Sequence, residues 1–98
     1  MQSVKVRKRG ISAEDAAVVI QRGLGEGYTA KADGEVEVLV RKGAFGRAKV
    51  RLNDESDGTK FDVNGQGFLI SIKIANDRGI AKRTAEILSE AAEYRDNA

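Results

Sequence analysis

The strongest constraint on the fold is a two-residue alternation of apolar and polar side chains across residues 35–52, which read EVEVLVRKGAFGRAKVRL. On both sides of a glycine-bounded loop every second residue is apolar: Val36, Val38 and Val40 before the loop, and Ala48, Val50 and Leu52 after it. A period of two sends successive side chains to opposite faces of a strand, so the pattern predicts two strands that share one buried face. The outer face of the second strand then carries Arg47, Lys49 and Arg51.

The same alternation predicts strands at residues 3–9 and 59–63 and a hairpin over residues 28–42. Apolar residues at helical spacing predict two amphipathic helices, at residues 12–24 and 78–94. Polar and glycine-rich stretches separate these elements, as is usual for turns.

The pairing of strands in the hairpin is predicted from the requirement that paired residues share a face. A two-residue loop would pair residues of opposite faces. A three-residue loop at residues 32–34, with Gly34 in the left-handed conformation, pairs Ala30 with Val36 and keeps the faces consistent. The three-residue loop is therefore expected.

Residues 68–76, FLISIKIAN, fit two structures. Alternation and β-branched residues favour a strand. Phe68, Leu69, Ile72 and Ala75 would also form a helical stripe that continues into the last helix. Of the two, the strand is the prediction.

These elements define an α+β fold with two layers. The expected order is β-α-β-β-β-(β)-α, with residues 68–76 as the strand in brackets. A mostly antiparallel sheet of four to five strands would carry both helices on one face. Residues 1–98 are expected to form a single domain, since a chain of 98 residues can bury a core without disulfides or a metal.

The composition argues against most enzymes and metal sites. The chain has no cysteine and no histidine, so it lacks thiol chemistry, the commonest general base and the commonest transition-metal ligand. No pair of carboxylates or triad is evident in the pattern, and neither catalysis, a cofactor nor a metal is expected. No apolar run approaches the roughly 20 residues of a membrane span, and the first residues lack the apolar stretch of a signal peptide. A cytoplasmic protein without membrane insertion is the expectation.

Positive charge is concentrated in the first half of the chain. Residues 1–52 hold 11 of the 17 cations and 6 of the 15 anions, a balance of +5, whereas residues 53–98 have a balance of −3. The outer faces of the predicted strands carry Lys5, Arg7, Arg9, Arg41, Arg47, Lys49 and Arg51. If the strands lie close together, these side chains form an array suited to phosphates. The alternative is a solvated face on which Glu35 and Glu37 form cross-strand ion pairs.

The loop at residues 42–46, KGAFG, is the second candidate site. Two glycines permit close approach of a partner, and Lys42 and Phe45 could contact it. The loop matches the bare GxxG of KH domains, but it is expected between strands rather than helices. It also approaches the RNA-recognition signature K-G-[FY]-[GA]-F, with Ala44 where an aromatic residue belongs. The alternative is a hairpin loop with Phe45 over the edge of the core.

Residues 4–52 resemble the N-terminal domain of the Jag family of RNA-binding regulators. The resemblance rests on Val4 and Val6, Ser12 to Leu24, Glu35 to Val40, Lys42 to Gly46 and Ala48 to Leu52. It implies a β-α-β-β start and a link to nucleic acid. In that family this unit precedes separate nucleic-acid-binding domains, for which residues 53–98 have no counterpart.

The sequence thus predicts a non-enzymatic binding module that contacts RNA or another polyanion through the basic strand face and the loop at residues 42–46. One alternative is the binding of a lipid or small hydrophobic ligand in a helix-grip-like cavity. Another is a protein-interaction or oligomerisation domain that uses an unpaired sheet edge to bind a protein partner.

Overall fold

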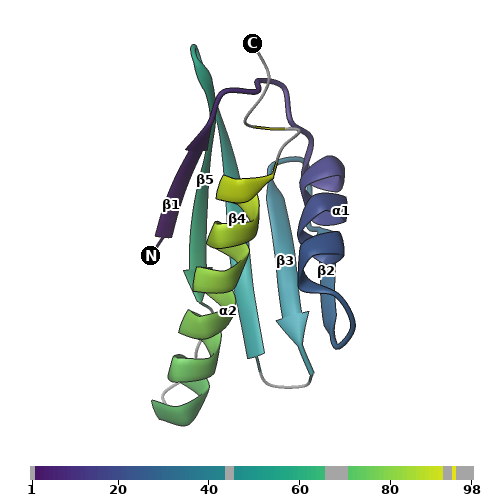
Figure 1. Ribbon diagram of the computed structural model, residues 1–98, viewed down its shortest axis with the longest axis vertical. Coiled ribbons are helices and arrows are strands. Elements are labelled where there is room, and N and C mark those ends of the chain that lie inside the picture. Colours follow the sequence, from purple (N-terminus) through teal and green to yellow (C-terminus); the bar gives the residue numbers. More distant parts are fainter. Residues whose placement is uncertain (1, 44–45, 66–70, 92–93, 95–98) are drawn as a thin grey trace.

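The computed structural model describes residues 2–43, 46–65, 71–91 and 94. These residues form five strands and two helices. Their order, which can be followed in Figure 1, is β1 (Gln2–Val6), α1 (Ala13–Leu24), β2 (Tyr28–Ala32), β3 (Glu37–Lys42), β4 (Gly46–Glu55), β5 (Gly58–Gly65) and α2 (Ser71–Glu90).

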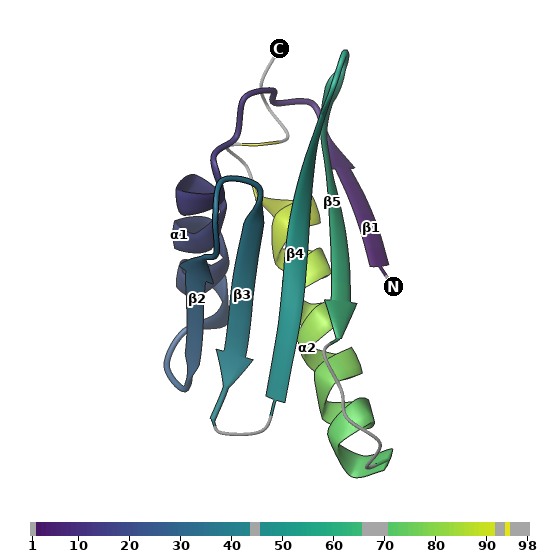
Figure 2. The same cartoon turned by 180° about the vertical axis from the view of Figure 1, so that it is seen from behind.

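The strands form one sheet in the order β1-β5-β4-β3-β2, and every neighbouring pair is antiparallel. Both helices lie on the same face of this sheet, in front of it in Figure 1 and behind it in Figure 2. We call the other side of the sheet the open face. The predicted α+β fold with two helices on one face of an antiparallel sheet is confirmed.

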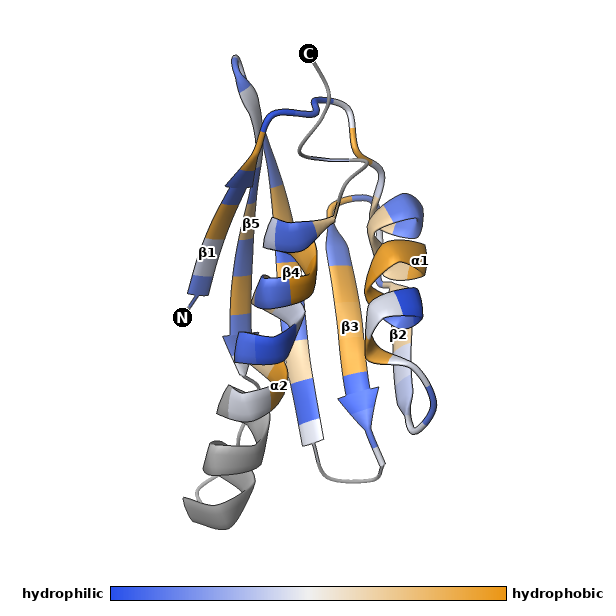
Figure 3. Ribbon diagram, in the orientation of Figure 1, coloured by the Kyte–Doolittle hydropathy of each residue, from blue (hydrophilic) through white to orange (hydrophobic). Residues whose placement is uncertain are grey.

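The core lies between the sheet and the helices. Ile20 of α1, Phe61 of β5 and Leu88 of α2 are fully buried there. The ring of Tyr94 stacks on that of Phe61 with 5.8 Å between the centroids. Figure 3 shows the alternation of apolar and polar residues along the strands that the sequence predicts. Val38, Val40, Ala48 and Val50 are buried as expected.

Helix α1 begins and ends at residues suited to those positions. The Ser12 side chain accepts a hydrogen bond from the backbone N–H of Asp15 at 3.1 Å, which satisfies one donor of the first turn. Gly25 ends the helix with its N–H donated to the carbonyl oxygen of Gln21.

The predicted register of the hairpin is wrong. Ala30 pairs with Val40 instead of Val36, and the loop covers residues 33–36. The N–H of Asp33 donates to the carbonyl oxygen of Glu37 at 2.7 Å. The shift of four residues is even, so it preserves every face, and face consistency could not distinguish the two registers. Val36, expected in the core, is 44% exposed in the loop.

The predicted strand at residues 68–76 is also wrong where the structure describes it. Residues 71–76 are the first part of α2, and residues 68–70 lie outside the described residues. The five strands of the described residues all fall within residues 2–65. The hairpin at residues 28–42 supplies two of them, so the sheet reaches five strands without residues 68–76. Continuation of the helix therefore outweighs the local preference of β-branched residues for a strand. The helix begins earlier and ends earlier than the expected residues 78–94.

Candidate functional site

The open face carries the polar members of each alternating strand. On β4 the partly exposed Arg47 and Lys49 and the exposed Arg51 alternate with buried apolar residues, as predicted. On β3 the same face holds Glu37, Leu39 and Arg41. On β2 it holds Thr29 and Lys31. The sheet register fixes which of these side chains are neighbours.

Four cations from three adjacent strands lie at one end of the open face. Arg41 is directly opposite Arg47, and Leu39 lies between Lys31 on one side and Lys49 on the other. We call Lys31, Arg41, Arg47 and Lys49 the cationic cluster. Within the part of the chain that the structure describes, Lys31, Arg41 and Lys49 form no ion pair.

A shallow depression of about 520 Å³ opens on this part of the face. Its lining includes the side chains of Thr29, Lys31, Leu39 and Arg41, with Asp33 also contributing. Sequence reasoning missed Lys31, because its position opposite Leu39 depends on the hairpin register. The residues that line the depression therefore include two cations, a hydroxyl, the apolar Leu39 and one carboxylate.

Arg51 lies in a different electrostatic environment. Its register partners are Glu37 on β3 and Asp62 on β5, so a carboxylate flanks it on either side. The Arg51 guanidinium is 3.8 Å from the Glu37 carboxylate. Asp62 also accepts hydrogen bonds from Ser3 at 2.9 Å and Asn53 at 3.0 Å. The cross-strand ion pair expected for Glu37 thus forms with Arg51, whereas Glu35 precedes β3.

The cations of the first strand lie at the far end of the sheet. The Lys5 ammonium is 2.9 Å from Asp57 and 3.1 Å from Glu55, at the tip of the β4–β5 hairpin. The Arg9 guanidinium is 3.8 Å from Asp54 in the same hairpin. Hydrogen bonding to Asp57 raises the pKa of Lys5, and that to Lys5 lowers the pKa of Asp57.

These cations do not join the cationic cluster. Lys5 pairs with Lys60 of β5, which pairs with Asn53 of β4. Along β4 Asn53 is six residues from Arg47, or roughly 20 Å at the rise of a strand. Arg7 is exposed in the bend after β1. The structure therefore separates the two groups of cations that the sequence suggested might converge.

The predicted loop at residues 42–46 is shorter in the structure, because Lys42 is the last residue of β3 and Gly46 is the first of β4. Lys42 shares its face with Val40 and lies over the ring of Tyr28, with 5.3 Å from Nζ to the ring centroid. This cation–π contact is on the helix side of the sheet, so Lys42 faces away from Arg41. Phe45 lies outside the described residues.

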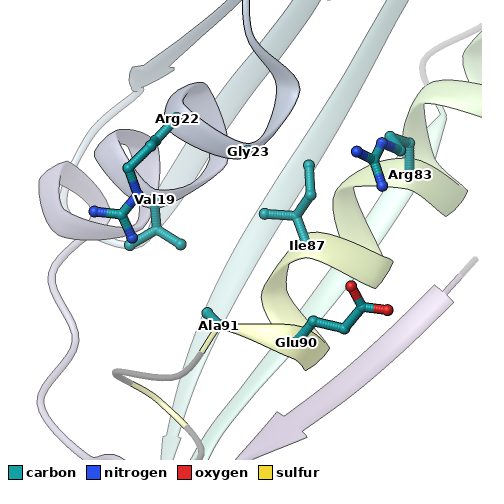
Figure 4. A pocket seen from close by; sticks show the side chains of 7 residues that line it. All are labelled: Val19, Arg22, Gly23, Arg83, Ile87, Glu90 and Ala91. Atoms are coloured by element: carbon teal, nitrogen blue, oxygen red, sulfur yellow. The ribbon is translucent and has the colours of Figure 1, made fainter.

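A second concavity lies on the helix side, between α1 and α2. It measures about 460 Å³ and is lined by Val19, Arg22, Gly23, Arg83, Ile87, Glu90 and Ala91. Figure 4 shows Ile87 in the space between the helices, with Arg22 and Arg83 on either side of it. The sequence gives no signal for this groove, since its residues come from two helices far apart in the chain.

Among the described residues no group of His, Cys, Asp or Glu side chains could hold a metal ion. No helix in this part of the chain is long and apolar enough to cross a membrane. Comparison of the chain with protein-family models, with curated proteins and with solved structures gives no match.

Proposed function

We propose that the chain is a non-enzymatic module that binds RNA, or another polyanion, on its open face through the cationic cluster. The proposal rests on one observation, that two groups of cations differ in whether a carboxylate pairs with them. Lys5, Arg9 and Arg51 lie beside carboxylates. In contrast, Lys31 and Arg41 line a shared depression without an ion pair to any described residue.

The geometry of the sheet supports contacts to successive phosphates. Adjacent strands are about 4.8 Å apart, and residues on one face of a strand repeat about every 6.7 Å. The cluster is therefore a small grid of long, adaptable cations on three strands. Arg41 can hold a phosphate through two parallel N–H donors, and the lysines act as point charges.

Such an interface binds mainly through the backbone of the nucleic acid. Neutralisation of phosphates releases counterions, so affinity depends steeply on salt and weakly on sequence. The resemblance of residues 4–52 to a domain of RNA-binding regulators agrees with RNA as the polyanion. Lys42 follows Arg41 at the end of β3 and Gly46 precedes Arg47 at the start of β4, so a polymer on the cluster would lie close to the backbone of both residues.

Charge reversal tests the proposal. Lys31→Glu combined with Lys49→Glu is expected to weaken binding of a fluorescent RNA oligonucleotide at least tenfold at low salt, measured by anisotropy. The matched control is Lys82→Glu with Arg83→Glu, which changes the net charge equally on exposed residues of α2. The control should bind within threefold of wild type. Equal loss in both variants would mean that net charge alone attracts RNA, and no loss in either would refute the proposed surface.

A further inference from the structure

The depression on the open face changes in chemical character along β2 and β3, which lie side by side at one edge of the sheet (Figure 2). At one end of its lining Thr29 and Arg41 are register partners. Lys31 and Leu39 are the next pair on this face. Asp33, which directly follows β2, lines the other end. The lining is therefore cationic at Arg41 and anionic at Asp33, with an apolar side chain between them.

Leu39 is the apolar residue in this arrangement, and all its neighbours on the face are charged. Along β3 the nearest residues on the same face are Glu37 and Arg41. Across the sheet its register partners are Lys31 on β2 and Lys49 on β4. Leu39 is partly buried, so part of its side chain remains open to a ligand. The depression of about 520 Å³ lies within the range of roughly 300–1,000 Å³ that is usual for small-ligand sites.

Phosphates alone do not match the whole of this lining. They are attracted by Lys31 and Arg41, but the Asp33 carboxylate repels them and Leu39 offers them no hydrogen bond. A nucleotide with an unstacked base has a part that suits each group. Its phosphate is anionic, and the flat face of its base packs against side chains. The edges of adenine, cytosine and guanine carry amino groups that can donate to a carboxylate.

We infer that the depression is a subsite for one unstacked nucleotide, and that the polyanion is therefore single-stranded RNA. The inference rests on the proposed function, because the phosphates of the same strand occupy the cationic cluster. The base lies over Leu39 with its edge toward the Asp33 carboxylate, and its phosphate contacts Arg41. An RNA duplex keeps its bases stacked inside the helix, so it offers phosphates to the cluster but no base to Leu39.

A variant of Leu39 tests the inference with three ligands: a single-stranded RNA oligonucleotide, the same sugar–phosphate backbone without bases, and an RNA duplex. Leu39→Thr keeps a residue that favours strands and removes the apolar contact. It is expected to weaken binding of the single strand at least about threefold and to change binding of the other two by less than about 1.5-fold. Each effect is the ratio of variant to wild type for one ligand, measured by anisotropy. Differences in charge between the ligands therefore cancel.

Two control variants separate this inference from the proposed function. Val18→Thr removes an exposed apolar side chain from α1, on the other side of the sheet, and should not affect any of the three ligands. Lys31→Gln with Lys49→Gln should weaken all three, because each of them contacts the cluster through phosphates. If Leu39→Thr weakens all three ligands equally, or none of them, the nucleotide subsite is refuted while the cationic cluster stands. If the lysine variant weakens none, the proposed function fails and the subsite fails with it.

A second variant gives the same test if circular dichroism shows that Leu39→Thr does not fold. Asp33→Ala removes the carboxylate that would repel a phosphate and accept from a base. It should strengthen binding of the base-free backbone, because a negative charge is lost, but strengthen binding of single-stranded RNA at least about twofold less, because the acceptor for the base is also lost. Equal strengthening for both ligands would overturn the inference.

Discussion

Replacement of Gly58 by alanine should destabilise the protein mainly by displacing β1. Gly58 begins β5 with φ at 157°, a conformation that L side chains rarely adopt. A Cβ at this position would overlap the backbone oxygen of Val6 and lie 3.0 Å from its carbonyl carbon. Neither atom is the end of a flexible side chain, so relief of the overlap requires β1 to move.

The expected loss can be estimated from these two effects. Backbone strain of this kind costs about 1–3 kcal/mol. Displacement of the end of β1 weakens its pairing with β5 at Val6 and Thr59, where a hydrogen bond contributes about 1 kcal/mol. Together they give about 2–4 kcal/mol, a large part of the roughly 5–15 kcal/mol that holds a domain folded.

The matched control is Gly34→Ala. Gly34 also has a positive φ, 92°, but a Cβ there would meet nothing within 4 Å. This variant therefore carries strain alone, about 1–2 kcal/mol. Urea denaturation monitored by circular dichroism gives both free energies, provided that the slope is unchanged. Amide exchange should accelerate in β1 of the Gly58 variant only. If Gly58→Ala were no more destabilising than Gly34→Ala, the argued overlap with β1 would be refuted.

Three further predictions concern separate parts of the molecule. If all four cations of the cluster contact RNA phosphates, a plot of the logarithm of the binding constant against the logarithm of the salt concentration should have a slope of about −2.8. The double variant Lys31→Gln with Lys49→Gln should reduce the slope to about −1.4. An unchanged slope in a salt titration would contradict phosphate contact at these residues. Thr84→Val should lower the free energy of unfolding by less than about 1 kcal/mol or should raise it, because the buried Thr84 hydroxyl has no hydrogen-bond partner in the described part of the chain. A clear loss of stability on thermal melting would reveal such a partner. The pKa of Asp57 is lowered by its interaction with Lys5, so this interaction stabilises the fold at pH values above 3.8, the ordinary pKa of the group. The contribution disappears as the pH falls through the lowered pKa of the folded state. Asp57→Asn should therefore melt slightly below wild type at neutral pH and together with it in strong acid, whereas a constant gap would exclude the ion pair as the cause.

The sequence was informative about faces and much less so about neighbours. Alternation predicted that Val38 and Val50 are buried and that Lys49 is not, because the side-chain period is a property of the strand itself. Strand order is a property of the whole chain. Nothing in residues 3–9 indicates that they pair with β5, two strands away from Arg41, so the separation of the two groups of cations could not be predicted.

The candidate site also shows that the neighbours of a residue are harder to predict than the face on which it lies. Lys31 joined the cluster only when the true register placed it beside Leu39, and that register differs from the expected one by an even number of residues. The hydrogen bonds that the Gln21 side chain of α1 makes with Tyr28 and Ala30 of β2 could not be predicted either, since a polar residue on a helix gives no sign of which strand it will meet. Local pattern thus predicted the layers of this fold, whereas the candidate surfaces arise from long-range pairing.

The distribution of charge on the open face is difficult to explain by stability alone. Like charges directly opposite one another on neighbouring strands are destabilising, and Arg41 is directly opposite Arg47. The same face offsets Arg51 with Glu37 on an adjacent strand, which shows that a carboxylate can be accommodated in this sheet. Lys31, Arg41 and Lys49 have no ion pair within the described residues, so the cations at one end of the face are offset by carboxylates less than Arg51 is. Under the proposed function, the phosphates of a polyanion would supply the negative charge that these three cations lack within the described residues.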